Sequence, residues 1–157
     1  MAEGWGRILL EVVTPDRQVL SVEADEVTAP GANGYFGVLP GHIPFITTLG
    51  LGELGYRIGN QWEYLAITWG YAEVLPNHVT ILTQTAEMAE EVDVERAERA
   101  KRRAEERLRE WSTTTADVDF ERASTALQRA AIRLQVAGKR VSPTRQRRPD
   151  PRERPPE

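Results

Sequence analysis

A change in the spacing of apolar residues near residue 87 is the feature that most constrains how this chain folds. Before it, short runs of branched and aromatic residues such as ILLEVV, IPFITTL and HVTILTQT are separated by turn sequences such as PGANG and PN. Many short strands joined by close turns predict an antiparallel sandwich or barrel over about residues 7–86. Over about residues 88–137, apolar residues instead recur every three to four positions, which predicts helices.

Two apolar stripes in the second segment consist mainly of alanine. They are formed by Ala97, Ala100, Ala104, Leu108 and Trp111, and by Phe120, Ala123, Leu127, Ala130, Leu134 and Ala137. Small side chains allow two helices to approach closely, so we expect an antiparallel helical hairpin that turns through residues 112–116. Stripes this narrow bury little apolar surface. We therefore expect the hairpin to pack against a further surface, and not always the same one.

The composition excludes several classes of site. The chain of 157 residues contains no cysteine and only two histidines, which excludes disulfides, thiolate metal sites, a cysteine nucleophile and a histidine-rich metal site. No apolar run approaches the ~18–20 residues of a membrane span, and the N-terminus lacks the pattern of a secretory signal. Residues 1–86 carry nine acidic and three basic residues, which argues against nucleic-acid binding by this segment.

The last segment, residues 139–157, is basic and rich in proline. It shows no apolar periodicity, so it is predicted to be a disordered tail. A solvated tail without a required role is one interpretation of it. Contact with an acidic partner or an anionic lipid is the other.

Two similar phrases, VDVERA from Val92 and VDFERA from Val118, each stand where a helical pattern begins. Asp93 and Asp119 are suited to cap a helix or to lie in its first turn, where a negative charge meets the positive end of the helix dipole. The valine before each aspartate is suited to pack against that turn. This structural interpretation explains both phrases without any ligand.

Four arginines permit a second interpretation of the helical segment. Arg96 and Arg103 share one face of the first predicted helix, and Arg129 and Arg133 share one face of the second. If the hairpin closes, the four guanidinium groups converge, and phosphate matches the geometry of the guanidinium fork. From the spacing alone, a solvated charged face and an anion site are both open.

Several phrases of the sequence resemble the epsilon family of bacterial F-type ATP synthases, called delta in mitochondria. They are GYFGVLPGH over residues 34–42 and WGYAEV over residues 69–74, followed by the two helical patterns. The likeness covers about residues 8–137. It implies an N-terminal ten-stranded antiparallel β-sandwich followed by a C-terminal antiparallel two-helix hairpin. It also implies a non-catalytic subunit of the central stalk, bound to the γ subunit and the c-ring, and peripheral on the cytoplasmic face of the bacterial plasma membrane.

The resemblance further implies how such a subunit acts. It would couple the proton-driven c-ring and the γ rotor to the catalytic head, and its helices would extend toward the α and β subunits to inhibit ATP hydrolysis. In some members the closed hairpin binds ATP, with magnesium, as a regulatory ligand, while no cofactor or metal site is required. The residues implied here for that site are Glu87, Asp93, Arg96, Ala97, Arg103, Arg129 and Arg133.

An interface with γ or the c-ring is implied at Tyr35, Phe36 and His42. Two positions depart from the family pattern, because Tyr35 replaces an acidic residue and Trp69 replaces the first of two glycines. At the ring, an aromatic contact would then replace an electrostatic one. Near Trp69, the local strand geometry or the contact with γ would differ.

These observations divide the chain into three parts. They are a β-sandwich domain over residues 1–87 that binds γ and the c-ring, a regulatory helical hairpin over residues 88–138, and the tail over residues 139–157. Two interpretations of other classes compete with this one. The first is a free β-sandwich ligand-binding module with a helical oligomerisation hairpin, and the second is a nucleic-acid adaptor that uses the tail and the helix arginines. An enzyme is disfavoured, because no nucleophile or acid–base constellation is evident.

Overall fold

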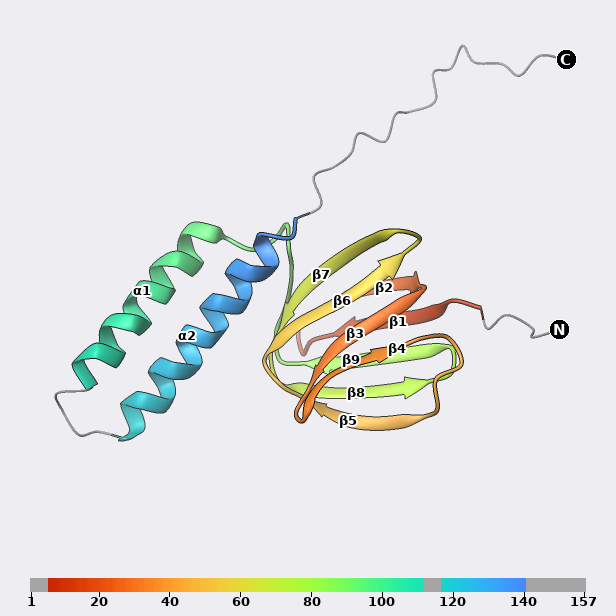
Figure 1. The fold of residues 1–157 in the computed structure, drawn as a ribbon, viewed down its shortest axis with the longest axis horizontal. Coiled ribbons are helices and arrows are strands. Elements are labelled where there is room, and N and C mark those ends of the chain that lie inside the picture. The colour runs from red at the N-terminus through yellow and green to blue at the C-terminus, as the bar shows by residue number, and fades with distance from the viewer. Residues whose placement is uncertain (1–5, 112–116, 141–157) are drawn as a thin grey trace, which may run out of the picture.

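The computed structural model describes residues 6–111 and 117–140, except for the side chains of residues 117–119. Ten strands come first and two helices follow (Figure 1). The strands are β1 (Ile8–Val13), β2 (Gln18–Ala24), β3 (Glu26–Gly31), β4 (Gly34–Val38), β5 (Phe45–Leu49), β6 (Gly52–Ile58), β7 (Gln61–Ile67), β8 (Gly70–Leu75), β9 (His78–Thr83) and β10 (Ala86–Met88). The helices are α1 (Val94–Trp111) and α2 (Asp117–Ala137). The expected turn through residues 112–116 and the tail beyond residue 140 lie outside the described residues.

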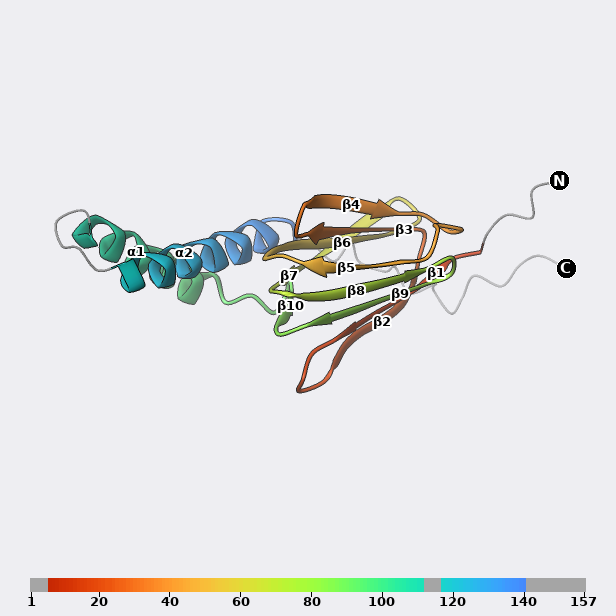
Figure 2. The ribbon, with the colours of Figure 1, turned by 90° about the horizontal axis from the view of Figure 1, so that it is seen from below.

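The ten strands form one sheet that folds over on itself as a sandwich (Figure 2). The order is β10-β7-β6-β3-β5-β8-β9-β1-β2, and β4 pairs with β3. The ten-stranded sandwich is thus confirmed, with one departure from antiparallel pairing: β1 and β9 run parallel, with Leu10 opposite Val79. Short turns force neighbouring strands to be antiparallel. No turn joins β1 to β9, so their direction depends on how the two layers close.

Alternate residues of the strands fill the interior of the sandwich. In β1, Ile8, Leu10 and Val12 are fully buried, and in β9 Val79 and Ile81 are fully buried. The same interior holds the other large aliphatic side chains that are fully buried in the strands, which are Val27, Val38, Leu54, Leu65, Ile67 and Val74. Burial of each such side chain contributes about 1.5–3 kcal/mol, so the strands enclose a substantial core.

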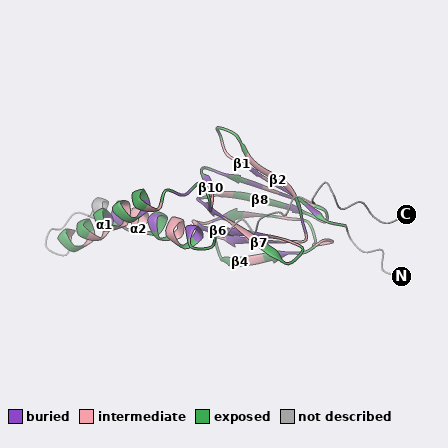
Figure 3. Ribbon diagram, turned by 90° about the horizontal axis from the view of Figure 1, so that it is seen from above, coloured by how far each residue is buried: buried purple, intermediate pink, exposed green. Residues whose placement is uncertain are grey.

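The two helices pack against each other through the predicted alanine stripes. Ala97, Ala104, Ala123 and Ala130 are each at most 3% exposed. The outer faces of the hairpin are mostly exposed (Figure 3). At the far end of the hairpin, the rings of Trp111 and Phe120 lie 4.7 Å apart. Within the described ranges, neither helix is long and apolar enough to cross a membrane.

The hairpin meets the sandwich through α2, which packs against β6 and β7. Val136 is fully buried at this contact against Ala66 and Ala89, and Ile132 and Tyr64 pack alongside. This small apolar cluster, called the junction below, is separate from the core of the sandwich. The expectation that the hairpin needs a further surface is met here by the sandwich itself.

Two residues assigned to the tail from the sequence are held in place in the structure. Lys139 Nζ lies 2.6 Å from Glu53 Oε1, and Arg140 donates hydrogen bonds to the backbone oxygens of Ala89 and Val92. Carbonyl and carboxylate oxygens next to the end of α2 attract these basic groups. The first two residues of the predicted tail thus attach the end of α2 to the sandwich.

Candidate functional site

A cavity of about 400 Å³ lies at the start of α1, beside the end of β10. It is lined by Glu87, Glu91, Asp93, Arg96, Ala97, Ala100, Arg103 and Arg133. Six of the seven residues predicted for a nucleotide site are in this group. Because α1 and α2 both contribute to the lining, the cavity exists only while the hairpin is closed. We call it the anion pocket below.

Asp93 builds the first turn of α1 next to this pocket. Its Oδ1 accepts a hydrogen bond from the backbone N–H of Arg96 at 3.0 Å, and its backbone oxygen accepts one from Ala97. The predicted capping role of Asp93 is thus confirmed. In the second phrase, α2 begins at Asp117, which places Asp119 in the first turn.

The acidic side chains that line the anion pocket beside Asp93 are already paired. Glu87 Oε1 accepts hydrogen bonds from Nε and Nη2 of Arg133 at 2.9 and 2.6 Å. Glu91 accepts hydrogen bonds from the side chain of Arg17 at 2.9 Å and from the backbone of Met88 at 3.1 Å. These two hydrogen bonds lower the pKa of Glu91 below its usual value. Glu87 and Glu91 are therefore largely neutralised by their partners.

Two guanidinium groups of the pocket have no such partner in the part of the chain that the structure describes. Arg96 and Arg103 have exposed side chains, and no side chain among the described residues forms an ion pair with either. Arg96 lies in the first turn of α1, where the helix dipole favours an anion. An unpaired guanidinium group beside a helix start can hold phosphate oxygens with paired hydrogen bonds.

Arg129 is absent from the lining of the anion pocket, although it lines a smaller cavity beside Glu87 and Arg133. Its Cζ lies 4.9 Å from the ring centroid of Trp69. A step of four residues turns a helix by slightly more than one full turn, so Arg129 and Arg133 point in related but not identical directions. The aromatic face of Trp69 then decides where Arg129 lies.

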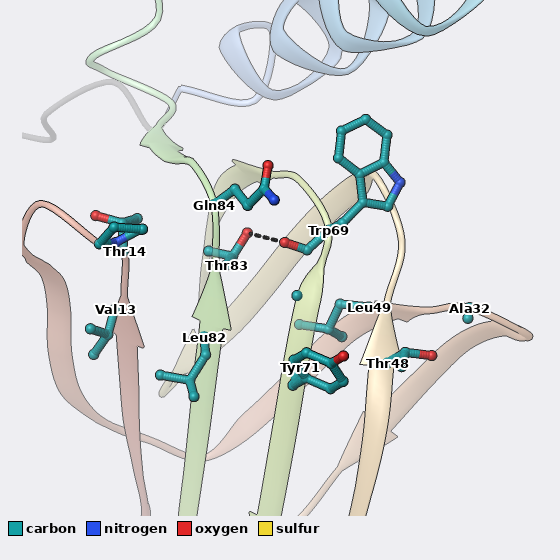
Figure 4. Close-up of a pocket in the computed structure, with 12 residues that line it drawn as sticks. Val13, Thr14, Ala32, Thr48, Leu49, Trp69, Tyr71, Leu82, Thr83 and Gln84 are labelled. Carbon is teal, nitrogen blue, oxygen red and sulfur yellow. Dashed lines mark hydrogen bonds between the residues drawn. The ribbon is translucent and has the colours of Figure 1, made fainter. Parts of the chain in front are cut away.

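The second candidate site is the outer face of β5, β8, β9 and β1 (Figure 4). A groove of about 760 Å³ runs across it. The groove is lined by Val13, Thr14, Pro15, Ala32, Thr48, Leu49, Trp69, Gly70, Tyr71, Leu82, Thr83 and Gln84. Tyr71 in the lining is 58% exposed, and the apolar surface continues beyond the groove to Ile46, which is 70% exposed. An apolar surface of this extent is typical of a protein contact.

The floor of the groove is a close approach of backbones. A Cβ atom added to Gly70 would lie 1.8 Å from the backbone oxygen of Leu82, so only glycine fits there. Thr83 Oγ1 donates a hydrogen bond to the backbone oxygen of Thr68 at 2.8 Å and contacts that of Trp69 at 3.3 Å (Figure 4). These contacts hold the turn between β7 and β8, and with it the indole of Trp69, at the rim of the groove.

The three predicted interface residues differ in how much surface they present. Tyr35 is 62% exposed, and its hydroxyl accepts a hydrogen bond from the backbone of Glu53 at 3.0 Å. Phe36 is half-buried against the sandwich core, with its ring 5.3 Å from that of Phe45. His42 is half-buried, with Nδ1 2.8 Å from the backbone oxygen of Ile43. Tyr35 is thus the most accessible of the three.

Sequence reasoning missed the apolar residues of the outer sheet face. Leu9, Ile46, Tyr71 and Leu82 are exposed, although each stands in a strand next to buried or half-buried positions. The sequence did indicate this surface, because these strands are apolar at both odd and even positions, and such strands are usually covered on both faces. Only the pairing of β5, β8, β9 and β1 brings these residues onto one surface.

Comparisons with known proteins match both segments of the chain to one family. Residues 7–89 match the family model of the ATP synthase delta/epsilon chain, beta-sandwich domain, and residues 90–138 match that of its long alpha-helix domain. The chain is 56% identical over 133 residues to an ATP synthase epsilon chain of Syntrophobacter fumaroxidans, with 85% of this chain and 97% of that one covered. It is 52% identical over 133 residues to ATP synthase epsilon chain 2 of Syntrophotalea carbinolica, with 85% and 95% covered.

A solved structure shows the same arrangement of strands and helices. The mitochondrial ATP synthase of Euglena gracilis, in a structure of OSCP, F1 and the c-ring, contains a similar chain with a TM-score of 0.71. The two sequences are 25% identical, and the match covers 84% of this chain and 81% of that one. The likeness therefore extends beyond the sandwich into the helices.

Proposed function

The chain belongs to the delta/epsilon family of ATP synthase chains, which are non-catalytic subunits. On this premise, we propose that it binds the γ subunit through the outer sheet face. The exposed apolar groove is the observation that carries this proposal. A free monomer rarely leaves so large an apolar surface open to water. The match of both segments to one family favours this function over a free ligand-binding module.

The proposal places the subunit on the central stalk of a proton-translocating F-type ATP synthase, peripheral to the cytoplasmic face of the membrane. There it couples the c-ring and γ to the catalytic head. Tyr35, Phe36 and His42 contribute a second contact, with γ or the c-ring, in which the exposed phenol ring of Tyr35 replaces a charged group. The aromatic ring supplies apolar contact area while its hydroxyl stays hydrogen-bonded to Glu53.

Binding to purified γ tests the outer-face contact. Leu82→Asp and Ile46→Asp place a charge on the groove face, and we expect each to weaken γ binding by about 10-fold or more, because a charge becomes desolvated at the interface. Gln61→Asp is the matched control, since it introduces the same side chain at an exposed position in β7, outside the groove. Equal binding by all three variants would contradict the proposal.

A regulatory role of the hairpin is the second part of the proposed function. The closed hairpin binds ATP, with magnesium, in the anion pocket, and when it opens its helices extend toward the α and β subunits and inhibit ATP hydrolysis. The pocket fits an anionic ligand, because Arg96 and Arg103 have no ion-pair partner among the described residues and Ala97 leaves room beside the helix start. Glu87 holds Arg133 in place, and Asp93 keeps the first turn of α1 formed.

Calorimetric titration of the full chain with Mg-ATP tests this second part. We expect Arg96→Ala and Arg103→Ala each to weaken binding by about 10-fold or more, because each removes a charge-assisted contact to phosphate. Arg107→Ala is the matched control, since Arg107 is an exposed α1 arginine outside the pocket. Absence of heat at millimolar Mg-ATP with the unsubstituted chain would contradict a nucleotide site. Arg129 belongs to the predicted set as well, but it must first leave Trp69 to reach the ligand.

A further inference from the structure

The contact between Trp69, at the rim of the groove, and Arg129 joins the sandwich to the hairpin outside the anion pocket. Trp69 stands in the turn between β7 and β8, at the rim of the groove and on the side that faces the helices (Figure 4). Arg129 lies on α2, with its Cζ 4.9 Å from the centroid of the indole ring. A guanidinium group at this distance over a tryptophan face forms a cation–π contact.

The contact lies at the surface of the molecule. Trp69 is 39% exposed, and Arg129 is also an exposed residue. On its other side, Arg129 lines a cavity of about 10 Å³ together with Glu87, Ile132 and Arg133. A cation–π contact at an exposed site is modest in strength, so a small effect on the attachment of α2 is expected.

The position of this contact along α2 allows it to restrict how the hairpin is oriented on the sandwich. The junction is centred on Val136, and the remaining attachments involve Arg133, Lys139 and Arg140, all within one turn or so of it. Arg129 stands seven residues before Val136, roughly 10 Å along the helix axis. A single anchor at one end lets a helix pivot, whereas a second anchor two turns away fixes its direction.

We propose that Trp69 and Arg129 form a latch that holds the helical hairpin closed against the sandwich without any nucleotide. The flat indole supplies a face that an aliphatic side chain in this turn cannot supply. The same stack keeps one arginine of the predicted nucleotide set outside the anion pocket. The latch acts in the isolated chain, so it does not depend on whether the pocket binds ATP.

Hydrogen exchange of the full chain in the absence of nucleotide tests the latch. The variants are Trp69→Ala, Arg129→Ala and the double variant, and the readout is exchange of the α2 amides over residues 123–137, which reports local opening. We expect each single variant to exchange about 2- to 5-fold faster there than the unsubstituted chain. The double variant should exchange no faster than the faster single variant, because both substitutions remove the same contact.

Two controls separate the latch from general damage. Arg122→Ala removes an exposed arginine of α2 that no cavity described above includes, and it should leave exchange of residues 123–137 unchanged. Amides of β1 and β9 should exchange at the unsubstituted rate in every variant. If Trp69→Ala also disturbs these strands, Arg129→Ala tests the same contact from the helix side.

Two results would overturn the latch. One is unchanged exchange of α2 in both single variants, and the other is a double variant whose acceleration equals the product of the two single effects. Failure of the calorimetric Mg-ATP titration would instead overturn the nucleotide site alone, because the exchange measurement contains no nucleotide.

Discussion

The sandwich and the hairpin are stabilised by different amounts of apolar packing. The sandwich encloses fully buried leucine, isoleucine and valine side chains contributed by most of its strands. In the hairpin, the most buried residues between the helices are alanines, and one valine, Val136, anchors it to the sandwich. Burial energy rises with apolar area. The sandwich can therefore stand alone as a rigid platform, whereas the closed hairpin depends on a few contacts and can be released by changing them.

The largest effect should come from the core of the sandwich. Leu54→Ala removes a fully buried side chain and should lower the free energy of unfolding by about 2–5 kcal/mol, because it leaves a cavity. Urea denaturation measures the loss. Leu82→Ala is the control, since Leu82 is half-exposed on the outer face. A similar loss in both variants would mean that the outer face is as important for stability as the core.

The next largest effect should come from a substitution between the two helices, which should destabilise the hairpin and not the sandwich. Ala130 is 1% exposed in the alanine stripe of α2, and Ala130→Leu should destabilise the closed hairpin by about 1–3 kcal/mol through overpacking. Hydrogen exchange should then accelerate in α1 and α2 but not in the strands. Gln128→Leu adds the same side chain at an exposed position of α2 and should have little effect. Equal acceleration in the strands would show that the two parts unfold as one unit.

A smaller effect is expected from the ionic attachment of α2. Lys139→Ala leaves the carboxylate of Glu53 without its cation and should weaken closure by about 0.5–1.5 kcal/mol, a value reduced because Lys139 is partly exposed. Exchange of the α2 amides measures this, with Lys101→Ala, which removes a surface pair in α1, as the control. The bond to Glu53 raises the pKa of Lys139. Its contribution should therefore be constant below about pH 10 and disappear as the pH rises through the raised pKa.

The smallest effect should come from Glu91, whose contribution to stability depends on pH in the acidic range. The pKa of Glu91 is lowered by hydrogen bonds from Arg17 and from the backbone of Met88. The stabilisation from Glu91 is thus present above its unfolded pKa of about 4.5 and is lost as the pH falls through the lowered value. Glu91→Gln should cost less than about 1 kcal/mol at neutral pH. Acid titration of stability should show a shallower loss below pH 4.5 in this variant, and an unchanged profile would contradict the assignment.

Sequence patterns predicted the fold well because they are local. The short run ILLEVV, rich in branched residues, predicts a strand, and the recurrence of Ala97 and Ala104 predicts a helix with one buried stripe. The cap at Asp93 was also predictable, because it involves residues three positions apart. The parallel pairing of β1 with β9 was not, since it joins strands that no turn connects.

The candidate sites show the same difference between local patterns, which are predictable from the sequence, and contacts between distant residues, which are not. The residues of the anion pocket were found by a family resemblance together with helix spacing, and six of the seven line one cavity. The place of Arg129 was not predictable from spacing, because it depends on which side chain of a distant turn lies across from it. The sequence indicated the apolar outer face only indirectly, through strands that contain more apolar residues than a strand with one buried face needs.

The periods, the caps and the alanine stripes are properties of this sequence alone, because backbone geometry repeats every two or 3.6 residues whatever the rest of the chain does. Which distant residues meet is a property of the tertiary structure, because it depends on how α2 is oriented on β6 and β7. That orientation brings Arg133 to Glu87, Lys139 to Glu53 and Arg129 to Trp69. Contacts over separations of 46 to 86 residues follow from the packing of whole elements.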